Sequence, residues 1–237
     1  MNGQNKLANV SRRNILKFGA ATIGTGVLTA GLGSKLMSPD TAVANNDITP
    51  DEALRLLMDG NKRFTSGKRR NIHQDLAHMK EVAKSQKPFA AILSCADSRV
   101  PSEIIFDRGF GDLFVCRVAG NVVTSEETGS LEFGTLVLGA KVIMVMGHKR
   151  CGAVDATIKG AQVPGQIASL LDAIKPCLSK VDSKDKARLE NTTKANVLMQ
   201  VENLKASPVM AELIQAGKLK IVGAYYDLDT GRVIMVS

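Results

Sequence analysis

Two short segments of the chain contain side chains that can hold a metal ion and move protons. The first, at residues 95–99, reads CADSR, and the second, at residues 148–152, reads HKRCG. Thiolate sulfur, imidazole nitrogen and carboxylate oxygen are common ligands of tetrahedral zinc in proteins. Either segment alone is a weak signal, but together they supply a complete set. The candidate metal ligands are Cys95, Asp97, His148 and Cys151.

These two segments need a scaffold that brings them together, because about fifty residues separate Asp97 from His148. Residues 89–93 and 142–146 are short apolar runs of the kind found in buried parallel strands, and each leads into one of the segments. Open α/β sheets bind their ligands beyond the carboxyl ends of the strands. We therefore expect the two strands to be neighbours, with the candidate ligands at one edge of the sheet.

The remaining sequence alternates between helical and strand patterns. Residues 49–52 read TPDE, which predicts a helix start with a capping box. Helices are expected at 49–64, 75–84, 126–138, 166–178, 184–204 and 209–215, and further strands at 112–118, 219–226 and 232–236. The last strand follows a turn and should run antiparallel. This order predicts an α/β fold: a mostly parallel sheet with flanking helices and a C-terminal antiparallel strand.

The beginning of the chain has the features of an export signal. Paired arginines at 12–13 precede an uncharged stretch at 18–34, and small residues at 42–44 suit a cleavage site. The arginine pair resembles a twin-arginine signal, which implies transport of the folded chain by the twin-arginine export machinery. We predict a cleaved signal peptide at 1–44 and a single catalytic domain at 45–237, without a stable membrane span in the mature chain. The alternative is an N-terminal anchor helix that stays in place.

An exported chain of this kind is expected in the periplasm, with the thylakoid lumen and the cell exterior as alternatives.

The composition of the chain is that of an ordinary globular protein: of 237 residues, 44% are hydrophobic and 23% are charged. This composition excludes a disordered, a collagen-like or a multi-spanning membrane protein. Half of the net charge of +8 lies in the first 44 residues. Basic clusters at 62–63 and 68–70 lack interleaved aromatic residues, so we expect no nucleic-acid partner.

Both chemical segments resemble the signatures of the β-class carbonic anhydrases. The resemblance extends over nearly all of the mature chain, including residues 117–121, 200–204 and 223–227, which read RVAGN, QVENL and GAYYD. It implies one zinc ion per chain with three permanent ligands and an active-site pair next to them. The ligands it implies are Cys95, His148 and Cys151, and the pair is Asp97 and Arg99. It also implies a homodimer or tetramer, in which the N-terminal helix at 49–64 lies on the neighbouring chain.

The implied reaction is the reversible hydration of carbon dioxide to bicarbonate and a proton by a zinc-bound hydroxide. Zinc lowers the pKa of a bound water, but two thiolates offset its charge, so activity should rise toward alkaline pH. Asp97 could fill the fourth zinc position and shut the site, while Arg99 could draw it away through a planar two-point pair. Asp97 could then accept the proton of the hydroxide. The alternative is that Asp97 and Arg99 form a purely structural pair.

Two other functions fit the same residues. An enzyme with this fold and these ligands could instead hydrolyse carbonyl sulfide or carbon disulfide, and the loops that control access would decide between the substrates. A non-catalytic protein could use zinc for stability and bind bicarbonate. A scaffold, however, has no need of Asp97 and Arg99 beside the metal ligands.

Two positions depart from the pattern of the family that the chain resembles. Phe133 stands where some relatives have a tyrosine, and it can supply only an apolar wall. Arg108 lies in a stretch where relatives often have a substrate-binding glutamine. It either replaces that glutamine or faces solvent.

The remaining histidines and cysteines are expected to lie outside the metal site. His73 and His78 have no spacing that ties them to the metal, so we expect them on the surface. Cys116 and Cys177 are expected to be structural packing residues, although an exported chain could join them in a disulfide.

Overall fold

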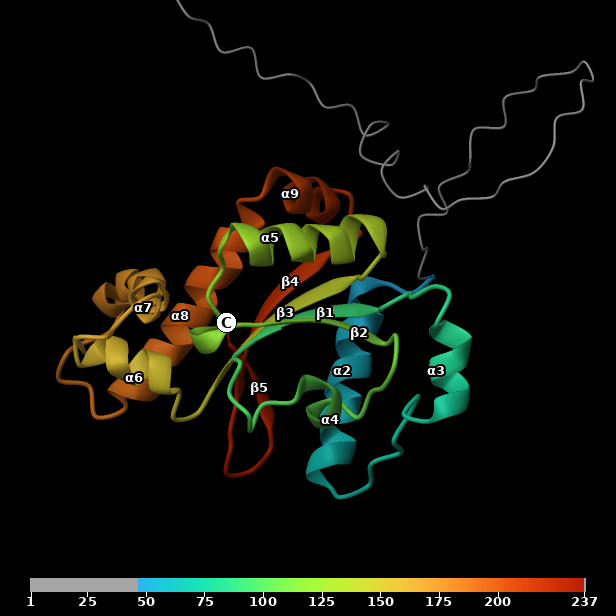
Figure 1. Cartoon of the computed structure of the whole chain (residues 1–237), viewed down its shortest axis with the longest axis horizontal. Helices are drawn as coiled ribbons and strands as arrows, with labels where there is room; N and C mark the ends of the chain where they lie inside the picture. Colours follow the sequence, from blue (N-terminus) through green and yellow to red (C-terminus); the bar gives the residue numbers. More distant parts are fainter. Residues whose placement is uncertain (1–46, 237) are drawn as a thin grey trace, which may run out of the picture. The chain divides into compact units, whose positions relative to one another are not determined.

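The computed structural model describes residues 47–236, so the expected signal peptide at 1–44 lies outside the described part. The described part is built on a five-stranded sheet with the strand order β2-β1-β3-β4-β5 (Figure 1). Neighbours among the first four strands run parallel, and β5 is antiparallel to β4, which confirms the predicted fold class. The strands are β1 (Ala90–Ser94), β2 (Leu113–Arg117), β3 (Val142–His148), β4 (Lys220–Tyr226) and β5 (Val233–Val236).

Helices pack on both faces of the sheet, and Figure 1 shows α5 and α9 on one side of the strands and α2 and α4 on the other. Within residues 47–236, no helix is both long and apolar enough to cross a membrane. The helices are α2 (Pro50–Thr65), α3 (Leu76–Val82), α4 (Ser102–Ile105), α5 (Ser125–Glu132), α6 (Gly152–Ile158), α7 (Ile167–Ile174), α8 (Arg188–Lys205) and α9 (Pro208–Gln215), with the shorter turns η2 (Ala119–Asn121), η3 (Phe133–Val137) and η4 (Lys175–Lys180).

The central strands are buried on both faces, as their continuous apolar runs predict. Successive side chains of a strand point to opposite faces. In β1, Ile92 therefore joins the core beneath α2, whereas Leu93 joins the core beneath α8 and α9. A third apolar cluster lies under α6 and α7 and surrounds Cys95 and Cys151.

Helix α2 begins as the sequence predicts. Thr49 accepts a hydrogen bond from the Glu52 backbone, and the Glu52 carboxylate accepts one from the Thr49 backbone, which completes the capping box. The apolar face of α2, with the fully buried Ala53 and Leu57, packs on the sheet of its own chain. Leu54, Met58 and Phe64 of the same helix remain partly exposed, so the contact between this helix and a neighbouring chain stays a prediction.

Two predicted helices are interrupted, and two short ones have no counterpart in the prediction. The helix expected at 126–138 is α5 followed by the π-helical turn η3, where the Thr135 hydroxyl donates to the Leu131 carbonyl. The helix expected at 166–178 is α7 followed by η4, because Pro176 has no N–H to continue the α-helical ladder. With 4 and 7 residues, α4 and α6 are too short to produce a periodic pattern.

Candidate metal centre and active site

Strands β1 and β3 are neighbours, as expected, and their carboxyl ends bring the two chemical segments together. Cys95 follows β1, His148 is the last residue of β3, and Cys151 caps the start of α6. One potential ligand atom from each of the three lies within 4.8 Å of the other two. Their exposed fractions are 4%, 0% and 1%, so the cluster is almost completely shielded from solvent.

The imidazole of His148 is oriented to bind a metal. Nδ1 lies 3.0 Å from the Lys149 carbonyl oxygen and donates to it, which leaves Nε2 as the acceptor atom of the ring. Nε2 is buried and has no hydrogen-bond partner among the described residues. A buried acceptor without a partner costs free energy, and a cation shared with two thiolates removes that cost. The two sulfurs and one nitrogen therefore fit zinc.

The two thiols of the cluster are electrostatically coupled. The hydrogen bond with Cys151 lowers the pKa of Cys95 and outweighs the opposing effect of burial. The same contact, together with burial, raises the pKa of Cys151. One negative charge is thus stabilised at the expense of a second, and a divalent cation would stabilise both thiolates. The Gly120 N–H also donates to Cys95 Sγ, at 3.3 Å.

Asp97 and Arg99 form a two-point ion pair beside the cluster. Arg99 Nε donates to Asp97 Oδ1 at 2.9 Å and Nη2 donates to Oδ2 at 2.8 Å, while the Arg99 backbone N–H adds a third bond. The side-chain bonds from Arg99 hold the pKa of Asp97 well below its usual range. Asp97 Oδ2 lies 3.8 Å from His148 Nε2. The carboxylate therefore borders the three grouped ligands while Arg99 holds it.

Arg117 belongs to the site, although it is not among the site residues predicted from the sequence. It ends β2 opposite Ser94 of β1. Its Nε donates to the Cys95 carbonyl at 3.1 Å, and its Nη2 donates to the Asp97 carbonyl at 2.5 Å. Arg117 thus fixes the backbone of the candidate ligand Cys95 and of Asp97. An arginine at a strand end gives no such signal until the pairing of the strands is known.

A second set of charged groups holds the loop between β3 and α6. Lys149 Nζ lies 2.9 Å from Asp229 Oδ2 and 3.4 Å from Asp227 Oδ2. Arg150 binds both carboxylate oxygens of Asp229, at 2.6 and 3.1 Å, and its φ of +57° puts it in the left-handed region. The turn between β4 and β5 therefore holds the segment 148–151, which contains two of the three candidate ligands.

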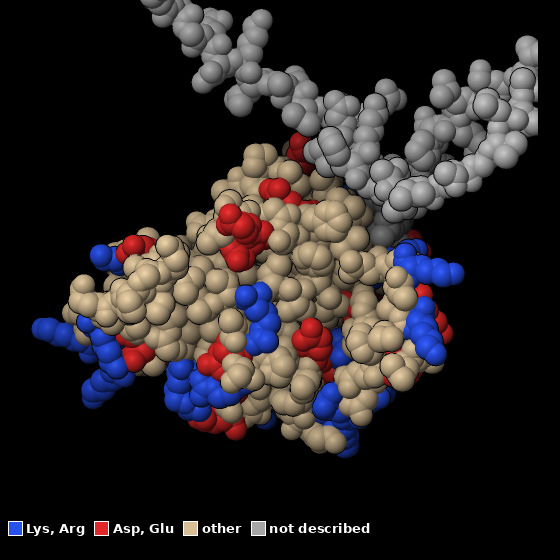
Figure 2. Space-filling view, in the orientation of Figure 1, with Lys and Arg blue, Asp and Glu red and all other residues tan. Residues whose placement is uncertain are grey.

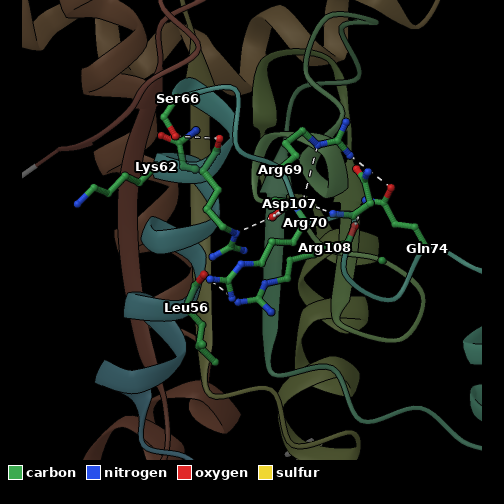
Figure 3. A network of polar contacts seen from close by, with 12 residues as sticks. Leu56, Lys62, Ser66, Arg69, Arg70, Gln74, Asp107 and Arg108 are labelled. Carbon is green, nitrogen blue, oxygen red and sulfur yellow. Dashed lines mark hydrogen bonds and ion pairs between the residues drawn. The ribbon is translucent and has the colours of Figure 1, made fainter.

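Arg108 is buried and contacts helix α2. It is only 7% exposed, so the expectation that it faces solvent is wrong. Its Nη2 donates to the Leu56 carbonyl of α2 at 3.0 Å, as Figure 3 shows, and its guanidinium lies 4.8 Å from the centre of the Phe89 ring. Burial lowers the pKa of Arg108. Among the described residues its side chain hydrogen-bonds to α2 alone, so it supports that helix, and its alternative role in place of a substrate-binding glutamine stays a prediction.

The remaining candidates lie apart from the metal cluster. Phe133 is 49% exposed on the surface of the single chain. His73 is exposed, as expected, and stacks on the partly exposed His78 with 3.9 Å between ring centres. Cys116 is half-buried and Cys177 is buried, and both are free thiols, so the alternative disulfide is not formed.

Comparison with known protein sequences points to one family. The family described as "Carbonic anhydrase" matches residues 90–233. Carbonic anhydrase 2 of Mycobacterium tuberculosis is 38% identical over 191 residues, which cover 78% of this chain and 92% of the relative. The carbonic anhydrase of Mycolicibacterium smegmatis is 36% identical over 196 residues, again covering 78% of this chain and 92% of the relative.

Solved structures agree with the sequence matches. A β-carbonic anhydrase from Coccomyxa, in complex with acetazolamide, is 28% identical with a TM-score of 0.62, covering 77% of this chain and 86% of its own. A tetrameric β-carbonic anhydrase from Sordaria macrospora has the same fold, with a TM-score of 0.63 at 23% identity over 78% of this chain and 98% of its own. The chain therefore belongs to the β-class carbonic anhydrase family, zinc enzymes that catalyse the reversible hydration of carbon dioxide.

Proposed function

We propose that this chain hydrates carbon dioxide with a zinc ion held by the three buried ligands, and that Asp97 and Arg99 position the reacting water. The observation that supports these roles most directly is the distance of 3.8 Å between Asp97 Oδ2 and His148 Nε2. It puts a charged carboxylate beside the ligand cluster, within reach of a water molecule that the same cluster would hold. Asp97 is also close enough to become a fourth ligand if Arg99 releases it.

When bound, zinc supplies a Lewis acid that makes water nucleophilic near neutral pH. Asp97 is ionised near neutral pH, because Arg99 lowers its pKa, so its oxygens can accept a hydrogen bond from the attacking water. Such a bond fixes the direction of the water lone pair toward the carbon of carbon dioxide. Arg99 limits the carboxylate to one orientation, since it binds both oxygens.

Zinc content and two activities, measured on one preparation, test this proposal. We expect about one zinc per chain, and carbon dioxide hydration that exceeds the hydrolysis of carbonyl sulfide or carbon disulfide. Cys151→Ser should lose most of the zinc and the activity. Cys116→Ser, which alters a half-buried thiol outside the ligand cluster, is the matched control and should keep both.

Other outcomes would each reject part of the proposal. Faster hydrolysis of carbonyl sulfide than hydration of carbon dioxide would identify the second enzyme. Bound zinc without either activity would indicate the non-catalytic bicarbonate-binding protein. Full zinc occupancy in Cys151→Ser would remove that residue from the set of ligands.

We also propose that the chain forms a homodimer or tetramer. Strand β2 is an edge of the sheet, and most of its residues are only half-buried, whereas β1 and β3 are completely buried. An edge strand presents backbone groups that a second chain can pair with. Phe133 and Leu136 are 49% and 38% exposed, and Gly134 between them packs against Phe114 of β2. Exposed apolar side chains thus adjoin the open edge.

The surface charge and one solved relative support the same proposal. In Figure 2, most charged side chains of the face shown lie along its lower border, and fewer, among them several acidic ones, interrupt the uncharged surface of its upper and central part. The Sordaria macrospora relative is tetrameric. The cores of interfaces between chains are typically depleted of charged residues.

Finally, we propose that residues 1–44 direct the folded chain through the twin-arginine machinery to the periplasm and are then removed. The support comes from the arginine pair, the uncharged stretch and the small residues that follow it. The chemistry of the site adds a reason. Two cysteine ligands would be exposed to oxidation if the chain crossed unfolded into an oxidising compartment, and folding around zinc beforehand protects them.

A further inference from the structure

Helix α8 carries a row of buried polar side chains that leads toward the metal centre. Thr192, Asn196 and Gln200 are four residues apart along one stripe of the helix, and their exposed fractions are 0%, 0% and 1%. Gln200 Nε2 donates to Asn196 Oδ1 at 3.0 Å. Burying an amide group costs free energy unless it forms hydrogen bonds, so the partners of Asn196 and Gln200 have to be identified.

Each of the two amides has a partner in the segment that follows β2, and Gln200 also contacts Ala173 and Asn203. Asn196 Nδ2 donates to the Gly120 carbonyl at 2.8 Å, and Gln200 Oε1 accepts from the Val123 N–H at 3.1 Å. Asn196 and Gln200 thus hold the segment 119–123 through two hydrogen bonds. The Gly120 N–H, in turn, donates to the sulfur of Cys95 at 3.3 Å.

The segment 119–123 contains a residue whose backbone conformation few residue types can adopt. Gly120 has a φ of +75°, in the left-handed region. A Cβ atom at this position would come within 2.6 Å of Ile174 Cδ1, so glycine also meets a steric demand. Glycine is flexible in the absence of tertiary contacts. The contacts with α8 add to the backbone bond between the Asn121 N–H and the Val118 carbonyl in fixing the direction of the Gly120 N–H toward the sulfur.

We infer that Asn196 and Gln200 are positioning residues for the metal: they hold the Gly120 N–H on Cys95 and thereby slow the release of zinc. A hydrogen bond from an N–H group to a thiolate spreads its negative charge and fixes the direction of the remaining lone pairs. Groups that orient a ligand in this way typically change metal affinity by about 10–100-fold. The inference rests on the zinc site proposed above.

The rate at which zinc-loaded protein transfers its metal to an excess of chelator tests the inference. Asn196→Leu removes the donor to Gly120 without introducing a charge, and it should release zinc about 10–100-fold faster than the wild type. Gln200→Met keeps the bond between Asn196 and Gly120, so it should have a smaller effect. Thr192→Val is the matched control, because the buried Thr192 hydroxyl has no hydrogen-bond partner among the described residues.

Two further measurements separate positioning from general stability. Zinc release is measured well below the melting temperature of every variant, so that zinc does not leave through global unfolding of the chain. In cobalt-substituted protein, the sulfur-to-metal absorption band should shift in Asn196→Leu and not in Thr192→Val. A lower melting temperature with wild-type zinc release and an unshifted band would overturn the inference.

Each remaining outcome also has a definite meaning. If Asn196→Leu fails to fold, Gln200→Met decides: faster release than from Thr192→Val supports the inference, and equal release rejects it. If the wild type itself retains no zinc, the proposed metal site fails together with the inference. Normal retention in the wild type with unchanged release in both variants rejects the inference alone.

Discussion

The position of Asp97 depends on Arg99, which donates three hydrogen bonds to its carboxylate. If Asp97 competes with water for the zinc, loss of the guanidinium should let it close the fourth position. Arg99→Ala should therefore keep its zinc while its activity falls by about 100-fold or more. Metal analysis and stopped-flow hydration measurements check this, and wild-type rates in Arg99→Ala would end the proposed mechanism.

Asp97→Ala should behave differently, because its site stays open. Zinc should remain on the three buried ligands, but hydration should still fall by about 100-fold, since the group that orients the water is gone. Because the pKa of Asp97 lies well below its usual range, this residue stays ionised across neutral and alkaline pH, so it should not produce a rise of activity toward alkaline pH. In a purely structural pair, both variants would instead lose stability together, which melting temperatures would reveal.

Among the elements, α2 and the loop after it are tied to the segment after α4 by one buried carboxylate. Asp107 accepts a hydrogen bond from Arg63 Nε at 2.6 Å and others from the backbone N–H groups of Arg70 and Asn71. Figure 3 shows Asp107 between α2 and this loop, near Arg69. Burial raises the pKa of Asp107, but the hydrogen bonds and Arg63 outweigh it, so the net pKa is lowered.

Asp107→Asn should lower the free energy of unfolding at pH 7 by about 3 kcal/mol, because it leaves a partly buried arginine without its charged partner. A carboxyl with a depressed pKa stabilises the fold above its ordinary pKa and loses that effect as pH falls through the folded value. The difference between wild type and variant should therefore shrink below about pH 4. Urea unfolding of wild type and variant at pH 7 and below about pH 4 measures this difference in the free energy of unfolding. A difference that does not change with pH would contradict the role of the charge on Asp107.

Asp59→Asn is the matched control for this experiment. Asp59 lies on α2 and is half exposed, and it forms an ion pair with Arg55 at 3.3 Å. Exposed pairs of this kind contribute little, so the change in the free energy of unfolding should stay within about 0.5 kcal/mol.

For the whole molecule, assembly should depend on the apolar groups next to the open edge of the sheet. Phe133→Glu puts a charge on this surface and should shift the chain from a dimer or tetramer to a monomer in light scattering coupled to size-exclusion chromatography. Leu76→Glu, at a position 68% exposed on α3, is the control and should leave the assembly unchanged. A wild-type chain that is monomeric at micromolar concentration would contradict the proposed assembly.

Export is the second prediction for the whole molecule. Replacing both arginines of the signal, Arg12→Lys with Arg13→Lys, should leave the unprocessed protein inside the cell, because the receptor reads the arginine pair. Cell fractionation and the mass of the protein measure the outcome. Normal export of the double variant would point to another pathway, and export without a loss of mass would favour the anchor helix.

The amino-acid sequence by itself determined the chemistry and most of the elements. Ligand types are a local property, so Cys95, His148 and Cys151 could be recognised as candidates from their residue types and spacing alone. Buried strands and the capping box at Thr49 depend on neighbours a few residues away, and both appear as expected. The interruption at η3 was missed, and there Gly134 lies against the ring of Phe114, a residue of another element.

The tertiary structure decided what surrounds the ligands. Arg117 holds the Cys95 backbone across 22 positions of sequence, and Asn196 binds Gly120 across 76. Arg108 turned inward for a similar reason, since its partner is the Leu56 carbonyl, 52 residues away on α2. No local pattern signals such contacts, because they form only when the sheet has placed distant segments side by side. The candidate residues for the chemistry could therefore be named from the sequence, whereas the contacts that position them became visible only in the fold.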